Sequence, residues 1–287
     1  MAGFFHSLFA LTPSMGIALI GIAFLAEYTD STLGMGYGTS LTPILLLMGF
    51  DPMQIVPAIL LSELVTGLLA GFTHHSMGNV DLLPRTLNVV RITRAIRSLG
   101  LAESYRRGIP THLKIVLLIS ACSIAGTVAA VLLAVSLPAF YLKLYIGLLI
   151  LIIGIVILIR RAASPRFSWK KITLLGLIAS FNKGMSGGGY GPVVTGGQIL
   201  SGIEGKNAVA ITSMAEGLTC LIGVMTYLGT GARIDWQLAP YLLAGAVVSV
   251  PLSAFTVKLI KTSTLRTVIG SLTVLLGCLT LYKVVLM

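Results

Sequence analysis

Residues 34–38 read Gly-Met-Gly-Tyr-Gly, and residues 187–191 read Gly-Gly-Gly-Tyr-Gly. The two motifs belong to a longer internal repeat, because residues 26–73 align without a gap on residues 179–226 after a shift of 153 positions. Thirteen positions are then identical, whereas about four coincidences are expected from average composition. Weak repeats whose hydrophobic segments are interrupted at equivalent places are typical of secondary transporters, which bind their substrate at the repeat interface.

The composition is that of an integral membrane protein. The 287 residues are 56% hydrophobic and 10% charged, whereas a soluble domain carries about 25% charged residues. The net charge of +11 does not indicate a nucleic-acid partner, because most basic residues lie between apolar segments, in stretches 85–114, 160–171 and 258–266. This is the positive-inside pattern, which places the three stretches in the cytoplasm.

Ten apolar segments follow one another along the chain, and several match the about 20 residues that a helix needs to cross a bilayer. Those beside the glycine motifs are shorter, so we expect broken or half-length helices there. Irregular backbone at membrane depth is tolerated only where it is buried in protein or lines a cavity. Asp51 before Pro52 predicts a helix start. The segments cover residues 14–30, 38–50, 53–75, 113–136, 139–159, 171–182, 189–202, 206–228, 236–257 and 265–286.

The charges between these segments predict how the chain is threaded. With the basic stretches inside, each half has five segments, and this odd number turns the second half upside down relative to the first. The sequence therefore predicts an all-α polytopic membrane protein with an inverted 5+5 repeat, broken helices at two glycine-rich motifs, and both termini outside. Residues 1–160 form the first repeat and residues 161–287 the second. Residues 83–110 have no counterpart and are expected to form an amphipathic helix on the cytoplasmic leaflet.

Glu63 and Glu216 are equivalent in the repeat, and each lies near the centre of an apolar segment. A charged side chain at the centre of a bilayer costs about 2.5–3.5 kcal/mol on insertion scales, and such residues are usually functional. Desolvation disfavours the charged form of a carboxyl group. We therefore expect both glutamates to be partly protonated near neutral pH and to couple transport to protons. A structural hydrogen bond to a neighbouring helix break is the alternative for either one.

The glycine clusters are the expected substrate site. Glycine lets the backbone leave the helix and lets a ligand approach closely, and the N-terminus of a restarting helix attracts an anion. Close packing of small residues is the alternative interpretation of such clusters. The residues expected to bind an anion are Gly36, Tyr37, Gly38, Thr39, Ser40, Asn182, Lys183, Ser186, Gly187, Gly188, Gly189, Tyr190 and Gly191.

Asp30 and Lys183 are also equivalent in the repeat and have opposite charges. An internal symmetry axis brings such equivalents together, so we expect either an Asp30–Lys183 ion pair or direct binding of the anion by Lys183. Glu27 is expected nearer the outer surface. His74 and His75 are expected at the membrane interface rather than in a metal site, because no further ligands lie nearby in the sequence.

Residues 184–187, Gly-Met-Ser-Gly, match the G-x-S-G motif of intramembrane serine proteases of the rhomboid type. Those enzymes need a histidine on a later helix to activate the serine, and none of the four histidines follows Ser186. The repeat equivalent of Ser186 is Leu33, so this serine is not part of the shared framework. A protease is therefore a remote alternative.

With these residues in view, the chain resembles the TauE/SafE family, the sulfite exporters and toluene-sulfonate uptake permeases. The resemblance rests on two glycine-rich breaks, residues 34–45 (GMGYGTSLTPIL) and 186–200 (SGGGYGPVVTGGQIL), each followed by a helix with small polar residues around its glutamate. It covers nearly the whole chain apart from residues 83–110. The resemblance implies that the breaks frame a site for a sulfur-containing anion, such as sulfite, thiosulfate, sulfoacetate or another organosulfonate.

The sequence thus predicts a secondary transporter, and not an enzyme, that moves a small sulfur-containing anion across the cytoplasmic membrane with protons. Its expected partners are that anion, protons and the lipid bilayer, and self-association is left open. No cofactor, metal or nucleic acid is expected, and no P-loop motif indicates ATP use. A carrier or channel for a different substrate, such as a carboxylate or a metal ion, is the main alternative.

Overall fold

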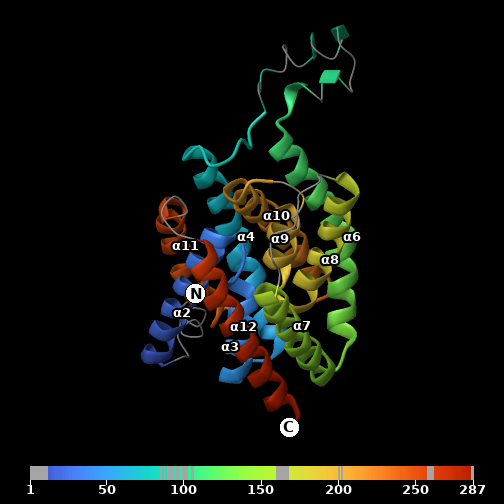
Figure 1. The fold of residues 1–287 in the computed structure, drawn as a ribbon. Coiled ribbons are helices and arrows are strands. Elements are labelled where there is room, and N and C mark those ends of the chain that lie inside the picture. The colour runs from blue at the N-terminus through green and yellow to red at the C-terminus, as the bar shows by residue number, and fades with distance from the viewer. Residues whose placement is uncertain are drawn as a thin grey trace, which may run out of the picture.

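The computed structural model describes residues 12–84, 86, 88, 93–94, 97–98, 103–104, 107–159, 168–199, 201, 203–256 and 262–285. Within these residues the fold is all-α (Figure 1). Each apolar segment expected from the sequence coincides with one helix to within a few residues, which confirms the all-helical prediction. The helices are α2 (Pro13–Leu33), α3 (Tyr37–Met48), α4 (Pro52–Ser76), α6 (Thr111–Ser136), α7 (Ala139–Ile159), α8 (Trp169–Ser186), α9 (Tyr190–Ile199), α10 (Gly205–Gly229), α11 (Ala239–Thr256) and α12 (Thr262–Val285).

Six of these helices, α2, α4, α6, α7, α10 and α11, are long and apolar enough to cross a membrane. Their outward faces carry exposed apolar side chains such as Ile17, Ile124 and Val248, and extensive apolar surface of this kind suits contact with lipid. By contrast, α3 has 12 residues and α9 has 10. At 1.5 Å per residue they reach about 18 and 15 Å, which is roughly half the hydrocarbon thickness. The half-length helices expected beside the glycine motifs are therefore present.

The ends of the helices follow the sequence signals closely. Gly34 ends α2 with φ 68° and its repeat equivalent Gly187 ends α8 with φ 71°, a left-handed conformation that glycine adopts at little steric cost. Asp51 and Gln54 form a capping box ahead of α4, in which the Asp51 N–H donates to Gln54 Oε1 over 3.0 Å. The predicted helix breaks and the predicted start of α4 are both confirmed.

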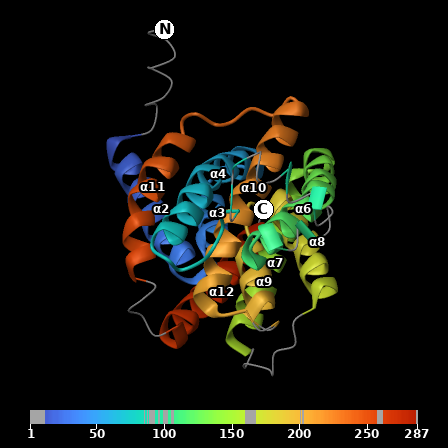
Figure 2. The ribbon, with the colours of Figure 1, turned by 90° about the horizontal axis from the view of Figure 1, so that it is seen from above.

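The helices pack in equivalent pairs in the two halves. α6 lies along α8 as α11 lies along α2, while α4 packs against α10 and α7 against α12. Figure 2 shows α2 with α11 on one flank, α6 with α8 on the opposite flank, and α4 with α10 between them. In chain order, the counterparts of α2, α4, α6 and α7 are α8, α10, α11 and α12. Exchanging counterparts turns the α6–α8 pair into the α11–α2 pair and leaves the other two pairs unchanged, as a two-fold repeat requires.

The first glycine break lies between two helices whose outer ends meet at the same end of the molecule. Near the start of α2, Gly16 packs against Tyr241 at the start of α11. In the first turn of α4, which follows α3, Gln54 Nε2 donates to Asp235 Oδ2 over 3.0 Å, and Asp235 lies in the loop that precedes α11. The chain therefore enters the protein along α2, breaks in the interior, and returns along α3.

The second break, between α8 and α9, is reached from the other end. Ile172 near the start of α8 and Ile203 after α9 pack in an apolar cluster with Val80 and Ile115, which follow α4 and begin α6. The two breaks thus approach each other from opposite ends of the molecule, the arrangement that an inverted repeat predicts. Which of these ends faces the cytoplasm stays a prediction.

Half of residues 83–110 lie outside the described part of the chain, so the predicted amphipathic helix stays a prediction. Several basic residues on which the predicted orientation depends also lie outside the described part of the chain: Arg160, Arg161, Arg166, Lys258 and Lys261.

Candidate functional site

The two glycine breaks contact each other backbone to backbone at the centre of the fold. A Cβ atom on Gly38 would collide with the carbonyl oxygen of Gly187, and a Cβ atom on Gly191 would collide with that of Gly34. These contacts are equivalent under the repeat, because Gly38 corresponds to Gly191 and Gly34 to Gly187. The two breaks can approach this closely only because these residues are glycines. This contact agrees with the alternative interpretation of the glycine clusters, that they allow close packing.

Threonine side chains fasten each break to the other. Thr42 Oγ1 donates to the carbonyl of Ser186 over 2.9 Å, and its repeat equivalent Thr195 Oγ1 donates to the carbonyl of Gly34 over 2.8 Å. The N–H of Gly189 donates to Thr39 Oγ1 over 3.2 Å. Carbonyl and N–H groups that the broken helices leave without helical partners are satisfied in this way.

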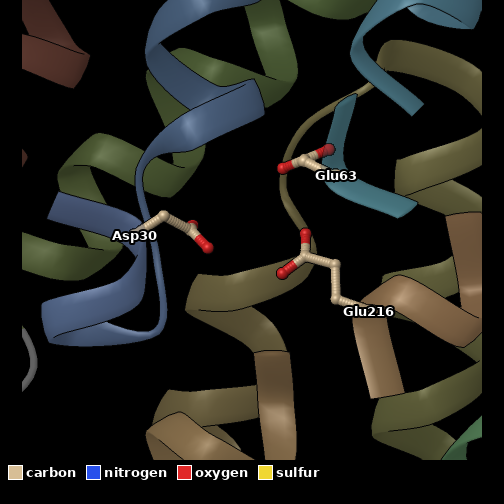
Figure 3. Close-up of side chains that lie close together, drawn as sticks. All are labelled: Asp30, Glu63 and Glu216. Carbon is tan, nitrogen blue, oxygen red and sulfur yellow. The ribbon is translucent and has the colours of Figure 1, made fainter. Parts of the chain in front are cut away.

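Three carboxylates from three helices converge beside the breaks. Asp30 comes from the last turn of α2, Glu63 from the middle of α4 and Glu216 from the middle of α10, and Figure 3 shows their carboxyl groups pointing into one shared space. One oxygen of each lies within 4.8 Å of the other two. All three side chains are buried.

Lys183, from the last turn of α8, neutralises part of this charge. Its Nζ donates to Glu216 Oε1 over 2.7 Å and forms an ion pair with Glu63 Oε2. Lys183 is 1% exposed. Because burying an unpaired charge is costly, its ammonium group is stabilised by pairing with a carboxylate on each of two sides. The two repeat-equivalent glutamates thus meet at one ammonium group.

Of the two alternatives for Lys183, the ion pair with Asp30 is not among the ion pairs of the described residues, in which Lys183 pairs with Glu63 and Glu216. Asp30 Oδ1 instead accepts a hydrogen bond from the N–H of Tyr37, over 3.2 Å. The physical reason is local, because Asp30 sits one break away from the free N-terminus of α3 and caps it. Lys183 extends toward α4 and α10, where the glutamates lie.

Glu27 is part of the same cluster, which corrects its expected position near the outer surface. It is 2% exposed, its Oε1 accepts a hydrogen bond from Ser31 Oγ (2.6 Å), and its Oε2 accepts one from Thr66 Oγ1 (3.1 Å). The sequence holds a usable signal for this placement, since Glu27 lies three residues before Asp30 on the same face of α2.

The cavity bounded by these groups is small, and most of the residues that line it have polar side chains. It holds about 180 Å³ of space between atoms, none of which admits a water-sized sphere. With all four carboxyl groups ionised and one ammonium group present, three negative charges would remain uncompensated in the protein interior, a state that burial strongly disfavours. The residues lining it are Glu27, Asp30, Glu63, Thr66, Gly67, Ser213 and Glu216.

The remaining residues expected at the substrate site lie around this cluster, and several of them form hydrogen bonds with neighbouring side chains of the protein. Tyr37 OH is 2.7 Å from Ser62 Oγ, and its equivalent Tyr190 OH accepts from Thr219 Oγ1 over 3.2 Å. Asn182 Oδ1 accepts from Tyr145 OH over 2.9 Å. Tyr37, Ser40, Asn182, Ser186, Gly187, Gly188, Gly189, Tyr190 and Gly191 are all buried at the junction of the breaks, as are Gly38 and Thr39.

Ser186 does not have the surroundings of a nucleophile. Its Oγ donates to the carbonyl of Asn182 (2.8 Å) and accepts from the N–H of Gly188 (3.1 Å). Within the described residues no histidine side chain forms a hydrogen bond with Ser186, and activation of a serine needs a neighbouring base. These hydrogen bonds fit a role in closing the end of α8.

His74 lies in the last turn of α4 and is buried in the protein, and its position at the membrane interface stays a prediction. Its Nε2 lies 3.2 Å from the carbonyl of Ser31, and its Nδ1 lies 3.1 Å from Asn79 Nδ2. His74 therefore ties the end of α4 to α2. His75 lies 3.1 Å from the carbonyl of Val80 through Nδ1 and orders the chain after α4.

Comparison of the amino-acid sequence with known proteins identifies a family and a relative of this chain. The profile of the family described as "Sulfite exporter TauE/SafE" matches residues 19–93 and 89–280. A protein of Bacillus subtilis (strain 168), named "Probable membrane transporter protein YtnM", is 28% identical over 279 residues, which cover 92% of this chain and 81% of that protein. No solved structure matches the chain significantly.

Proposed function

This chain belongs to the sulfite exporter TauE/SafE family and is a membrane transporter, and from that premise we propose that it carries a small sulfur-containing anion together with protons. Sulfite, thiosulfate and organosulfonates such as sulfoacetate are the proposed substrates, and the cytoplasmic membrane is the proposed location. The description of the family supports the substrate class.

The observation that carries the proposal is the group of four buried carboxyls, two of which pair with one ammonium, at the junction of two broken helices. An anion does not enter such a site while the carboxyls are charged, because like charges in a low dielectric repel strongly. Protonation of all four carboxyls leaves a single positive charge on Lys183, which balances a singly charged sulfonate. Anion binding and proton binding are then linked by charge balance.

Lys183 supplies the proposed switch between the two states. While Glu63 and Glu216 are charged, its ammonium group is held by both of them. When they take up protons the ammonium is released and becomes available to the anion, beside the N-termini of α3 and α9, whose dipoles also favour negative charge. Lys183, Asn182, Ser186 and the glycine motifs are the proposed substrate contacts, and Glu63 and Glu216 are the proposed coupling groups.

Alternating access would follow from movement of the proposed repeats, residues 1–160 and 161–287, about this junction. The cavity is closed to a water-sized sphere in the structure, so substrate entry requires the helices to separate. Because the breaks approach from opposite ends, separating the helices at one end opens a path to one side of the membrane.

The test is uptake of sulfite and of sulfoacetate into proteoliposomes, with and without an imposed pH gradient. We expect flux that depends on the gradient, and we expect Glu63→Gln and Glu216→Gln to abolish that dependence. Glu204→Gln is the matched control, because Glu204 is exposed and pairs with Lys206 at the surface over 3.2 Å. Flux of neither anion through folded protein would refute the substrate class, and gradient-independent flux would refute the coupling.

A further inference from the structure

The carboxylate cluster has the ligands of a cation site. Asp30, Glu63 and Glu216 each offer an oxygen, and these three atoms lie within 4.8 Å of one another. A cation that binds oxygen at about 2.4 Å separates ligands on opposite sides by about 4.8 Å. Thr66 and Ser213 line the same cavity and carry hydroxyl oxygens that suit a hard cation.

One atom in the cluster points independently to a ligand. Glu63 Oε1 is buried and meets no hydrogen-bond donor within the described residues. The residue is only 2% exposed, and its side chain lines the cavity. Buried carboxylate oxygens are normally satisfied. Figure 3 shows the Glu63 carboxyl group directed toward those of Asp30 and Glu216.

Lys183 shows which charge such a ligand would have. Its ammonium group lies between Glu63 and Glu216 and contacts both, so one positive charge already occupies this position on a flexible side chain. A monovalent ion that replaced it would leave the charge between the two glutamates unchanged. A divalent ion would change that balance by one charge.

We infer that Asp30, Glu63 and Glu216 form a binding site for sodium, which displaces the Lys183 ammonium from between the two glutamates. The role of this ion in transport rests on the proposed function, because sodium releases Lys183 to the anion in the same way that protons do. The binding itself does not depend on which anion is carried, or on whether an anion is carried at all.

Binding is measured on the purified full-length protein in detergent, without sulfite or sulfonate. Equilibrium binding of radioactive sodium and the thermal unfolding midpoint are followed as sodium chloride replaces choline chloride at constant ionic strength. We expect saturable binding and a saturable rise of the midpoint with sodium, and a smaller rise with potassium. Absence of saturable sodium binding by the wild-type protein would overturn the inference, as would binding of calcium in place of sodium.

Three variants locate the site. Glu63→Gln removes one anionic ligand and should weaken sodium binding by at least about tenfold. Lys183→Gln removes the competing ammonium and should bind sodium more tightly than the wild type, whereas the exposed control Glu204→Gln should bind as the wild type does. Unchanged affinity in Glu63→Gln and Lys183→Gln would place the ion elsewhere and overturn the inference. If either variant fails to fold, the wild-type binding measurement still decides.

This experiment separates the inference from the proposed function. Sodium binding without any anion flux would refute the proposed substrates and keep the site. Anion flux driven by pH gradients, in a protein that shows no sodium binding, would keep the proposed function and overturn the site.

Discussion

Lys183 is the side chain on which the central cluster depends. It is the ammonium group that faces Glu63 and Glu216, and it lies in the same interior as Glu27 and Asp30. Breaking a buried ion pair by removing one partner costs about 3–5 kcal/mol, because the other charge is left buried and unpaired. Here two glutamates lose their partner at once.

We therefore predict that Lys183→Met destabilises the protein by about 3–5 kcal/mol at neutral pH in sodium-free buffer. The variant should regain stability as the pH falls, because protonation removes the unpaired charge of the glutamates. Denaturant unfolding in detergent across a pH series measures both effects. Lys206→Met is the control, since Lys206 lies at the surface, and equal stability of the two variants at neutral pH would contradict the prediction.

The half-helices α3 and α9 are positioned by contact between their preceding breaks. Gly191→Ala should destabilise the protein by about 1–3 kcal/mol, the usual range for overpacking, because the added Cβ meets the carbonyl of Gly34. Gly196→Ala in the same helix is the matched control, since its Cβ would have no neighbour within 4 Å. It should be neutral or slightly stabilising, and the two unfolding midpoints check the difference. Equal tolerance at both positions would show that the breaks are not in close contact.

The individual helices could be predicted from the sequence because each depends on local signals. Apolar runs gave their extents, and glycines such as Gly34 and Gly187 marked their breaks. Glu63 and Glu216 could be recognised because each is a charge within an apolar segment, and Lys183 because it is the oppositely charged repeat equivalent of Asp30. Their pairing could not, since it depends on how α4, α8 and α10 pack. Glu27 was misplaced for a related reason: position along α2 does not give depth when the chain turns back inside the protein.

The molecule as a whole is predicted to insert with the two ends of α10 on opposite sides of the membrane. With the basic stretches inside, the start of α10 faces the cytoplasm and its end faces outward. Thr230→Cys should therefore react with a membrane-impermeant maleimide in intact cells, and Lys206→Cys only after permeabilisation. The wild-type chain, whose cysteines lie in helices of the membrane region, is the background control. The reverse labelling pattern would contradict the predicted orientation.

The contact between the two breaks also bears on whether protons can leak through the centre of the protein. Gly38 packs on Gly187 and Gly191 packs on Gly34 with no room for a side chain, and the acidic cavity beside them excludes a sphere the size of water. A continuous file of water through the centre would conduct protons and dissipate the membrane potential. Two backbone segments in direct contact leave no space between them for such a file.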